Sequence, residues 1–123
     1  MVPAVFINCA RFPFIDWILS GRKIYETRTR DTLRRFIGQT VYLAETGRGA
    51  PVVRAMATIE SVLIVRSRRE YNQLRKSTAV PSGSSYDWTD DTKKKCLYKL
   101  VNVVPVSPFV PSGQRHGRVW MEA

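Results

Sequence analysis

The fold of this chain is decided by the stretch GRKIYETRTR, which runs from Gly21 to Arg30. An apolar run precedes it, and Gly21 stands where a helix would end in a left-handed cap. From residue 24 onward, charged and neutral residues alternate as on a strand, where successive side chains point to opposite faces. Glu26, Arg28 and Arg30 are therefore expected on one face, with Lys23 at the start of the strand. The opposite face would carry Tyr25, Thr27 and Thr29.

The surrounding sequence predicts short strands and short helices. Apolar, β-branched runs predict strands over residues 5–10, 24–30, 40–45, 52–65, 96–104 and 118–122, with a bend near Glu60. Pro13 predicts the start of a helix over 14–19. Ser67 and Glu70 have the spacing of a capping box at the start of a second helix, over 68–78.

The end of the chain is predicted to be irregular. Pro105, Pro108 and Pro111 favour a connection that is not a central strand, and Gly113–Gly117 favours a turn. We find no internal repeat and no linker, so residues 1–123 are expected to form a single domain. The element pattern indicates an α+β fold, a small mixed β-barrel of five to six strands with two or three short helices.

The charge balance indicates a polyanionic partner. Twenty basic and ten acidic side chains give a formal net charge of +10. Such an excess favours RNA or another nucleic acid, because lysines and arginines neutralise phosphates and release counterions. An anionic membrane surface is the competing interpretation, but no basic amphipathic helix supports it.

Cysteine and histidine usage argues against a metal or thiol site. Cys9 and Cys96 are far apart and lie in apolar, strand-like surroundings, so buried free thiols are expected. With a single histidine, no zinc site and no Cys–His pair is expected, and no cofactor is implied. Pro3, Arg11 and Pro13 interrupt the first apolar run, so neither a signal peptide nor a membrane span is expected. The predicted localisation is cytoplasmic.

Four residues of the opening stretch carry a family resemblance. Gly21, Lys23, Glu26 and Arg28 match the Gly-x-Lys-x-x-Glu-x-Arg motif that follows an apolar helix in the ASCH domain, a branch of the PUA-like superfamily. The order of the predicted elements resembles that family over nearly the whole chain. The resemblance implies a PUA-like barrel with a cleft where the motif charges converge. It also implies nucleic-acid binding, mostly of RNA, and in a few members hydrolysis.

One departure separates this chain from the hydrolytic relatives. The group that removes the acetyl group from N4-acetylcytidine resembles this chain at Lys23 and Arg28, but it carries a nucleophilic threonine where this chain has Glu26. Strand alternation places Thr27 and Thr29 on the wrong face to replace that threonine. A carboxylate is a poor substitute for an activated hydroxyl in amide cleavage.

The charge balance and the motif together indicate the candidate site residues. Lysine and arginine are phosphate ligands, and a glutamate can orient them or accept hydrogen bonds from a base. The nucleic-acid-binding candidates are Lys23, Glu26, Arg28, Arg30, Tyr25, Arg48, Arg54, Trp88 and Arg115. If the protein is an enzyme, Lys23 would stabilise negative charge and Glu26 would act as general acid or base. The aromatic residues Tyr86 and Trp88 either fasten their loop to the core or stack on a base.

The leading hypothesis is RNA or nucleotide binding through a basic cleft around the motif. The alternative is a small hydrolase that acts on a modified nucleoside or on RNA with the same cleft. A third interpretation, a module that docks an acidic protein, explains the charge but not the motif.

Overall fold

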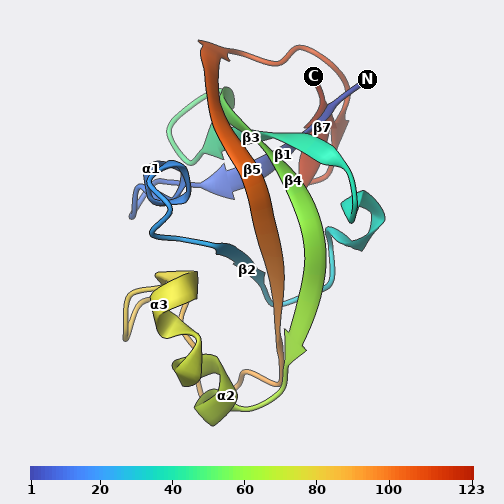
Figure 1. Ribbon diagram of the computed structural model, residues 1–123. Helices are drawn as coiled ribbons and strands as arrows, with labels where there is room; N and C mark the ends of the chain where they lie inside the picture. The colour runs from blue at the N-terminus through green and yellow to red at the C-terminus, as the bar shows by residue number, and fades with distance from the viewer.

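A computed structural model describes residues 1–123, and it contains one mixed sheet of seven strands (Figure 1). The strands are β1 (Pro3–Asn8), β2 (Tyr25–Arg28), β3 (Thr40–Thr46), β4 (Val52–Val65), β5 (Lys95–Phe109), β6 (Arg115–His116) and β7 (Trp120–Glu122). The helices are α1 (Phe14–Leu19), α2 (Arg68–Gln73) and α3 (Arg75–Thr78), with a 3-10 turn, η1, at Arg34–Phe36. The predicted α+β class is confirmed, and the three short helices agree with the expected two or three.

The hydrogen-bonded strand order is β2-β5-β4-β3-β1-β7-β6. β1 and β3 are parallel, and the other neighbours are antiparallel. The order begins at β2 and ends at β6 without returning, so backbone pairing alone gives an open sheet rather than a closed barrel. The strand beyond the expected five to six is β6, which occupies part of the predicted Gly113–Gly117 turn because Arg115 and His116 pair with β7.

The long strand β5 corrects one prediction. It continues through Pro105 and Pro108, where an irregular connection was expected. β2 pairs only with Cys96 to Lys99, so the later part of β5 has an open edge, and its register with β4 shifts repeatedly there. Proline is tolerated at an edge and at irregular pairings because a missing N–H there removes no regular ladder bond. The register also shifts between Ile59 and Ser61, near the bend predicted in β4.

The helix ends agree in part with the sequence. Gly21 has φ +82° immediately after α1, as the predicted left-handed cap requires. The Ser67 hydroxyl accepts a hydrogen bond from the Glu70 amide, so the first half of the capping box is present. The predicted 68–78 helix is divided at Leu74, whose backbone leaves the helical conformation (φ −103°, ψ 8°). Leu74 packs instead on a small cluster of Val65, Tyr71 and Leu97.

The decisive strand is shorter than expected. β2 ends at Arg28, so Arg30 lies outside it in an exposed bend. α3 lies beside β2 in the fold (Figure 1), and the Ile24 amide donates to the Ser77 oxygen. This contact places the segment that carries Lys23 against the end of α3.

The main core lies between α1 and the sheet. Sixteen buried residues form it, including Phe14, Ile15 and Ile18 of α1. Cys9 and Cys96 belong to it as buried free thiols, as predicted. Both chain ends lie side by side (Figure 1), since β1 pairs with β7. None of the helices is long and apolar enough to cross a bilayer.

Candidate functional site

A cleft of about 540 Å³ lies between β2, β1 and the loop that follows α3. Its charged lining consists of five cations and one carboxylate: Lys23, Arg28, Lys95, Arg115, Arg118 and Glu26. The remaining lining is polar (Asn8, Thr27, Thr29, Thr46 and Ser85) or apolar (Phe6, Ile7, Phe14 and Tyr86). The cleft is therefore strongly cationic, with an aromatic wall.

Lys23 is almost completely buried, at 2% exposure. Its Nζ donates to the Thr78 main-chain oxygen at 2.7 Å and lies 3.9 Å from a Glu26 oxygen. The Nζ also lies 4.8 Å from the centre of the Phe14 ring. Burial lowers the pKa of Lys23 to about 8, against the attraction of Glu26, which raises it. The ammonium is thus charged at neutral pH and titrates under mildly basic conditions.

Glu26 and Arg28 form an ion pair beside Lys23. Glu26 is 7% exposed, and its Oε2 lies 3.0 Å from Arg28 Nη2 and 3.1 Å from Arg28 Nε. The same Nη2 donates to the Phe6 main-chain oxygen at 2.6 Å. Because Phe6 belongs to β1, the Arg28 side chain connects the edge strand β2 to β1, two strands with no ladder between them.

Lys95, the first residue of β5, is a second buried lysine. Lys95 is 5% exposed, and its Nζ donates to the Tyr86 main-chain oxygen at 3.0 Å. Burial lowers its pKa, and Asp87 opposes that shift. The Tyr86 ring meets the Phe14 ring edge-on at 5.3 Å, so the loop is fastened to α1 at the aromatic wall of the cleft.

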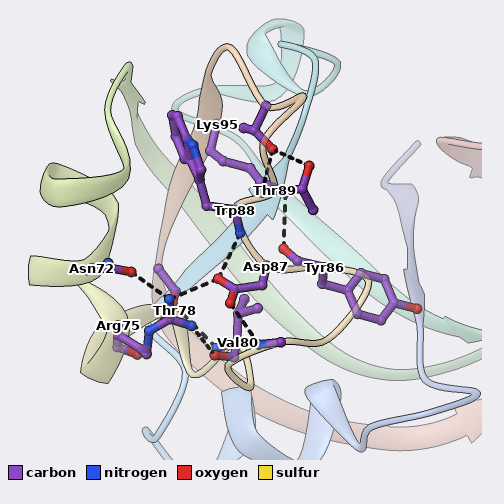
Figure 2. A network of polar contacts seen from close by, with 11 residues as sticks. Asn72, Arg75, Thr78, Val80, Tyr86, Asp87, Trp88, Thr89 and Lys95 are labelled. Carbon is purple, nitrogen blue, oxygen red and sulfur yellow. Dashed lines mark hydrogen bonds and ion pairs between the residues drawn. The ribbon is translucent and has the colours of Figure 1, made fainter.

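Asp87 holds this loop in place (Figure 2). Its two oxygens accept hydrogen bonds from the amides of Gly83 and Trp88 and from Arg75 Nη2. Burial raises the pKa of Asp87, but the hydrogen bonds from Gly83, Arg75 and Trp88 outweigh it and hold the pKa below its usual range. The loop wall is therefore pinned to α3 rather than free.

Four of the nine predicted binding residues line the cleft: Lys23, Glu26, Arg28 and Arg115. The other five lie elsewhere. Tyr25 and Trp88 pack against the Val65 cluster, with the Trp88 ring 5.8 Å from that of Tyr71. Arg54 is paired with Asp16 and Glu45, while Arg30 and Arg48 are exposed outside the cleft.

Two placements differ from the alternation argument. Thr27 and Thr29 line the cleft together with Glu26 and Arg28, although they were expected to face away. β2 is the outermost strand of the sheet and ends at Arg28, so residues from both of its faces reach the open side. Lys95 also lines the cleft, although it was not among the predicted site residues.

The charged side chains of the cleft are of the kind that could hold an anion. No group of three or more His, Cys, Asp or Glu side chains is arranged to hold a metal ion. Buried ammonium and guanidinium donors in a concave site bind phosphate or carbonyl oxygens strongly, because little water screens them there.

Comparisons with known proteins identify the fold. No protein-family model matches the chain, and no curated protein matches it. The crystal structure of ASCH from Zymomonas mobilis matches with a TM-score of 0.70 at 20% identity, over 87% of this chain and 73% of that chain. Two mutants of that protein, one serine-to-alanine and one tyrosine-to-phenylalanine, match with the same TM-score and identity, over 73% and 75% of their chains. The chain therefore has an ASCH-like fold, as the resemblance in its opening stretch implied.

Proposed function

We propose that this protein binds single-stranded RNA, with an unpaired nucleotide entering the cleft around Lys23, Glu26 and Arg28. The observation that carries the proposal is the cleft itself, which sets five cations against one carboxylate beside an aromatic wall. The formal net charge of +10 supports a polyanionic ligand. The ASCH-like fold supports nucleic acid as that ligand.

The position of the cleft suits an unpaired nucleotide. The sheet is open between its edge strands β2 and β6. On this side of the molecule Arg28 reaches from β2 to the Phe6 oxygen of β1, beside the cleft. An unstacked base would approach Tyr86 and offer its polar edge to Glu26 and Lys23. Arg115 and Arg118 are exposed at the rim, where they would contact the phosphate backbone.

Fluorescence anisotropy with labelled single-stranded RNA tests the proposal. Affinity should fall steeply with added salt, and Lys23→Met should weaken it by roughly tenfold or more, because one buried charged donor is lost. Lys93→Met is the matched control, since Lys93 is exposed and outside the cleft. Equal affinity of wild type and Lys23→Met would place the site elsewhere. Tighter binding of DNA, or binding only to an acidic protein, would replace RNA as the partner.

A second candidate function is hydrolysis of a modified nucleoside. Thr27 and Thr29 line the same cleft as Lys23, whose pKa of about 8 suits proton transfer near neutral pH. In this reaction a threonine hydroxyl or water would attack the acyl carbon, and the bond from that carbon to the nucleoside would break. Lys23 would stabilise the oxyanion and pass the proton of the nucleophile to the departing nucleoside, and an acyl-threonine, if formed, would be hydrolysed by water. Incubation with a panel of acylated nucleosides, followed by mass spectrometry, tests it. No product with any of them rejects this candidate and leaves RNA binding intact.

A further inference from the structure

Lys95 is a buried cation without an anionic partner in contact. It is 5% exposed, and no carboxylate lies within 4.0 Å of its Nζ, since it takes part in none of the ion pairs of this structure. Burial of an unpaired ammonium costs folding free energy. If Lys95 served only to fill space, a methionine could fill the same space without the free-energy cost of a buried charge.

The ammonium also has donors to spare. A lysine carries three N–H donors, and only one hydrogen bond is made here, to the Tyr86 main-chain oxygen at 3.0 Å. Lys95 lines the cleft, so its remaining donors are available to an acceptor that enters there.

Lys95 is linked to the motif lysine through the aromatic wall. Its acceptor, Tyr86, packs its ring on Phe14, and the Phe14 ring lies 4.8 Å from Lys23 Nζ. The two buried ammonium groups therefore border one aromatic pair within a single cleft. The one carboxylate of the cleft, Glu26, lies beside Lys23 and Arg28 and makes no contact with Lys95. Lys23 thus has a carboxylate in ion-pair contact, whereas Lys95 has none and feels only the more distant Asp87.

We propose that Lys95 is the phosphate ligand of the cleft, and that it donates to a phosphate oxygen of the nucleotide whose base lies near Lys23 and Glu26. The proposal rests on the proposed RNA binding and adds a division of labour to it. Lys23, which is paired with Glu26, contacts the base, and Lys95, which has no ion pair, contacts the phosphate. A point-charge ammonium suits phosphate oxygens, and the phosphate supplies the contacting anion that Lys95 lacks in the protein itself.

Oligoribonucleotides in which each phosphodiester in turn is replaced by an uncharged methylphosphonate test this assignment. With wild-type protein, one position should weaken binding by about ten- to a hundredfold, the loss expected for a hydrogen bond between charged groups. Lys95→Met should bind the unmodified RNA more weakly by a similar factor, and it should be insensitive to neutralisation of that one phosphate. Removal of the terminal phosphate from a second set of RNAs distinguishes a terminal monoester from an internal diester.

Two controls separate the possible failures. Lys93→Met, two residues before Lys95, should retain the full sensitivity of the wild type, because Lys93 is exposed and lies outside the cleft. Lys95→Gln removes the charge but can still donate to Tyr86, and it should show the same loss as Lys95→Met if the charge is what matters. If both Lys95 variants respond to every methylphosphonate as the wild type does, the assignment is wrong. If the wild type binds no RNA, the proposed function itself fails.

The thermal midpoint of Lys95→Met distinguishes a ligand-binding role of Lys95 from a purely structural one. Lys95→Met should leave the thermal midpoint unchanged or raise it, because the variant no longer buries an unpaired charge. A large fall in the midpoint, with unchanged RNA affinity per folded molecule, would assign Lys95 to the scaffold instead.

Discussion

Arg28 Nη2 donates to the Phe6 main-chain oxygen at 2.6 Å, and the same nitrogen lies 3.0 Å from Glu26 Oε2. One guanidinium therefore connects two strands that share no backbone ladder and also neutralises a nearly buried carboxylate. Arg28 also lines the cleft, so one side chain both ties the fold together and belongs to the candidate site.

Arg28→Met should destabilise the fold by about 2–4 kcal/mol, because it leaves the Glu26 carboxylate with Lys23 as its only cation, 3.9 Å away. Urea denaturation measures the change. Arg30→Met, an exposed control without an ion pair, should change stability by less than about 0.5 kcal/mol. In a Glu26→Gln background the cost of Arg28→Met should shrink. An undiminished cost would mean that the pair contributes little.

Lys23 should make stability depend on pH between about 8 and 10. Its pKa is lowered from 10.5 to about 8 in the folded protein, so in this window the unfolded chain binds more protons than the folded one. Stability from this group therefore rises with pH, by about 2–3 kcal/mol from pH 7 to pH 10. The quantity to measure is the free energy of unfolding of the wild type minus that of Lys23→Met across this range. A flat difference would show that the pKa of Lys23 is not lowered.

Asp87 should control the loop that carries Tyr86. Asp87→Ala removes three hydrogen bonds, from Gly83, Trp88 and Arg75, and should cost about 2–3 kcal/mol of stability. Hydrogen exchange should show faster exchange of the Gly83 and Trp88 amides, and RNA affinity should fall as the aromatic wall loosens. Asp90→Asn is the control, because Asp90 is 98% exposed. Unchanged amide protection in Asp87→Ala would mean that packing alone holds the loop.

The two arginines Arg115 and Arg54 should differ in their effect on RNA binding. Arg115 lines the cleft and has no ion pair, so Arg115→Met should reduce the slope of log affinity against log salt by about 0.7. Arg54 is already paired with Asp16 at 2.6 Å and Glu45 at 3.3 Å, so Arg54→Met should leave the slope nearly unchanged. Equal slopes for both variants would indicate that RNA does not follow the rim of the cleft.

The thiols of Cys9 and Cys96 should be unreactive toward thiol reagents in the native protein. Burial raises the pKa of Cys9 and of Cys96, and neither side chain is accessible. A thiol reagent at pH 8 should therefore modify no cysteine without denaturant and both cysteines in urea. Rapid labelling of either thiol in native conditions would require local opening of the core.

The sequence alone determined the local structure around the motif. A glycine that ends an apolar helix, followed by alternating charges, predicted the helix end and the strand that follows it, because capping and strand propensity depend on neighbouring residues only. The α+β class, the buried cysteines and the cationic character follow in the same way from periodicity and composition. Lys23, Glu26 and Arg28 were found because they lie close together in the chain.

Only the tertiary structure decided which distant residues lie in the cleft with Lys23, Glu26 and Arg28. Lys95 lies in a run of three lysines, and the sequence carries no sign of which one is buried. Pairing of Val65 with Lys95 across β4 and β5 turns it inward. Likewise Arg54 and Trp88 have side chains suited to bind RNA, but they lie outside the cleft. Arg54 is paired with Asp16, and Trp88 packs on Tyr71. The ends of strands and the composition of a cleft depend on which segments meet in space, and that is set by the packing of the whole chain.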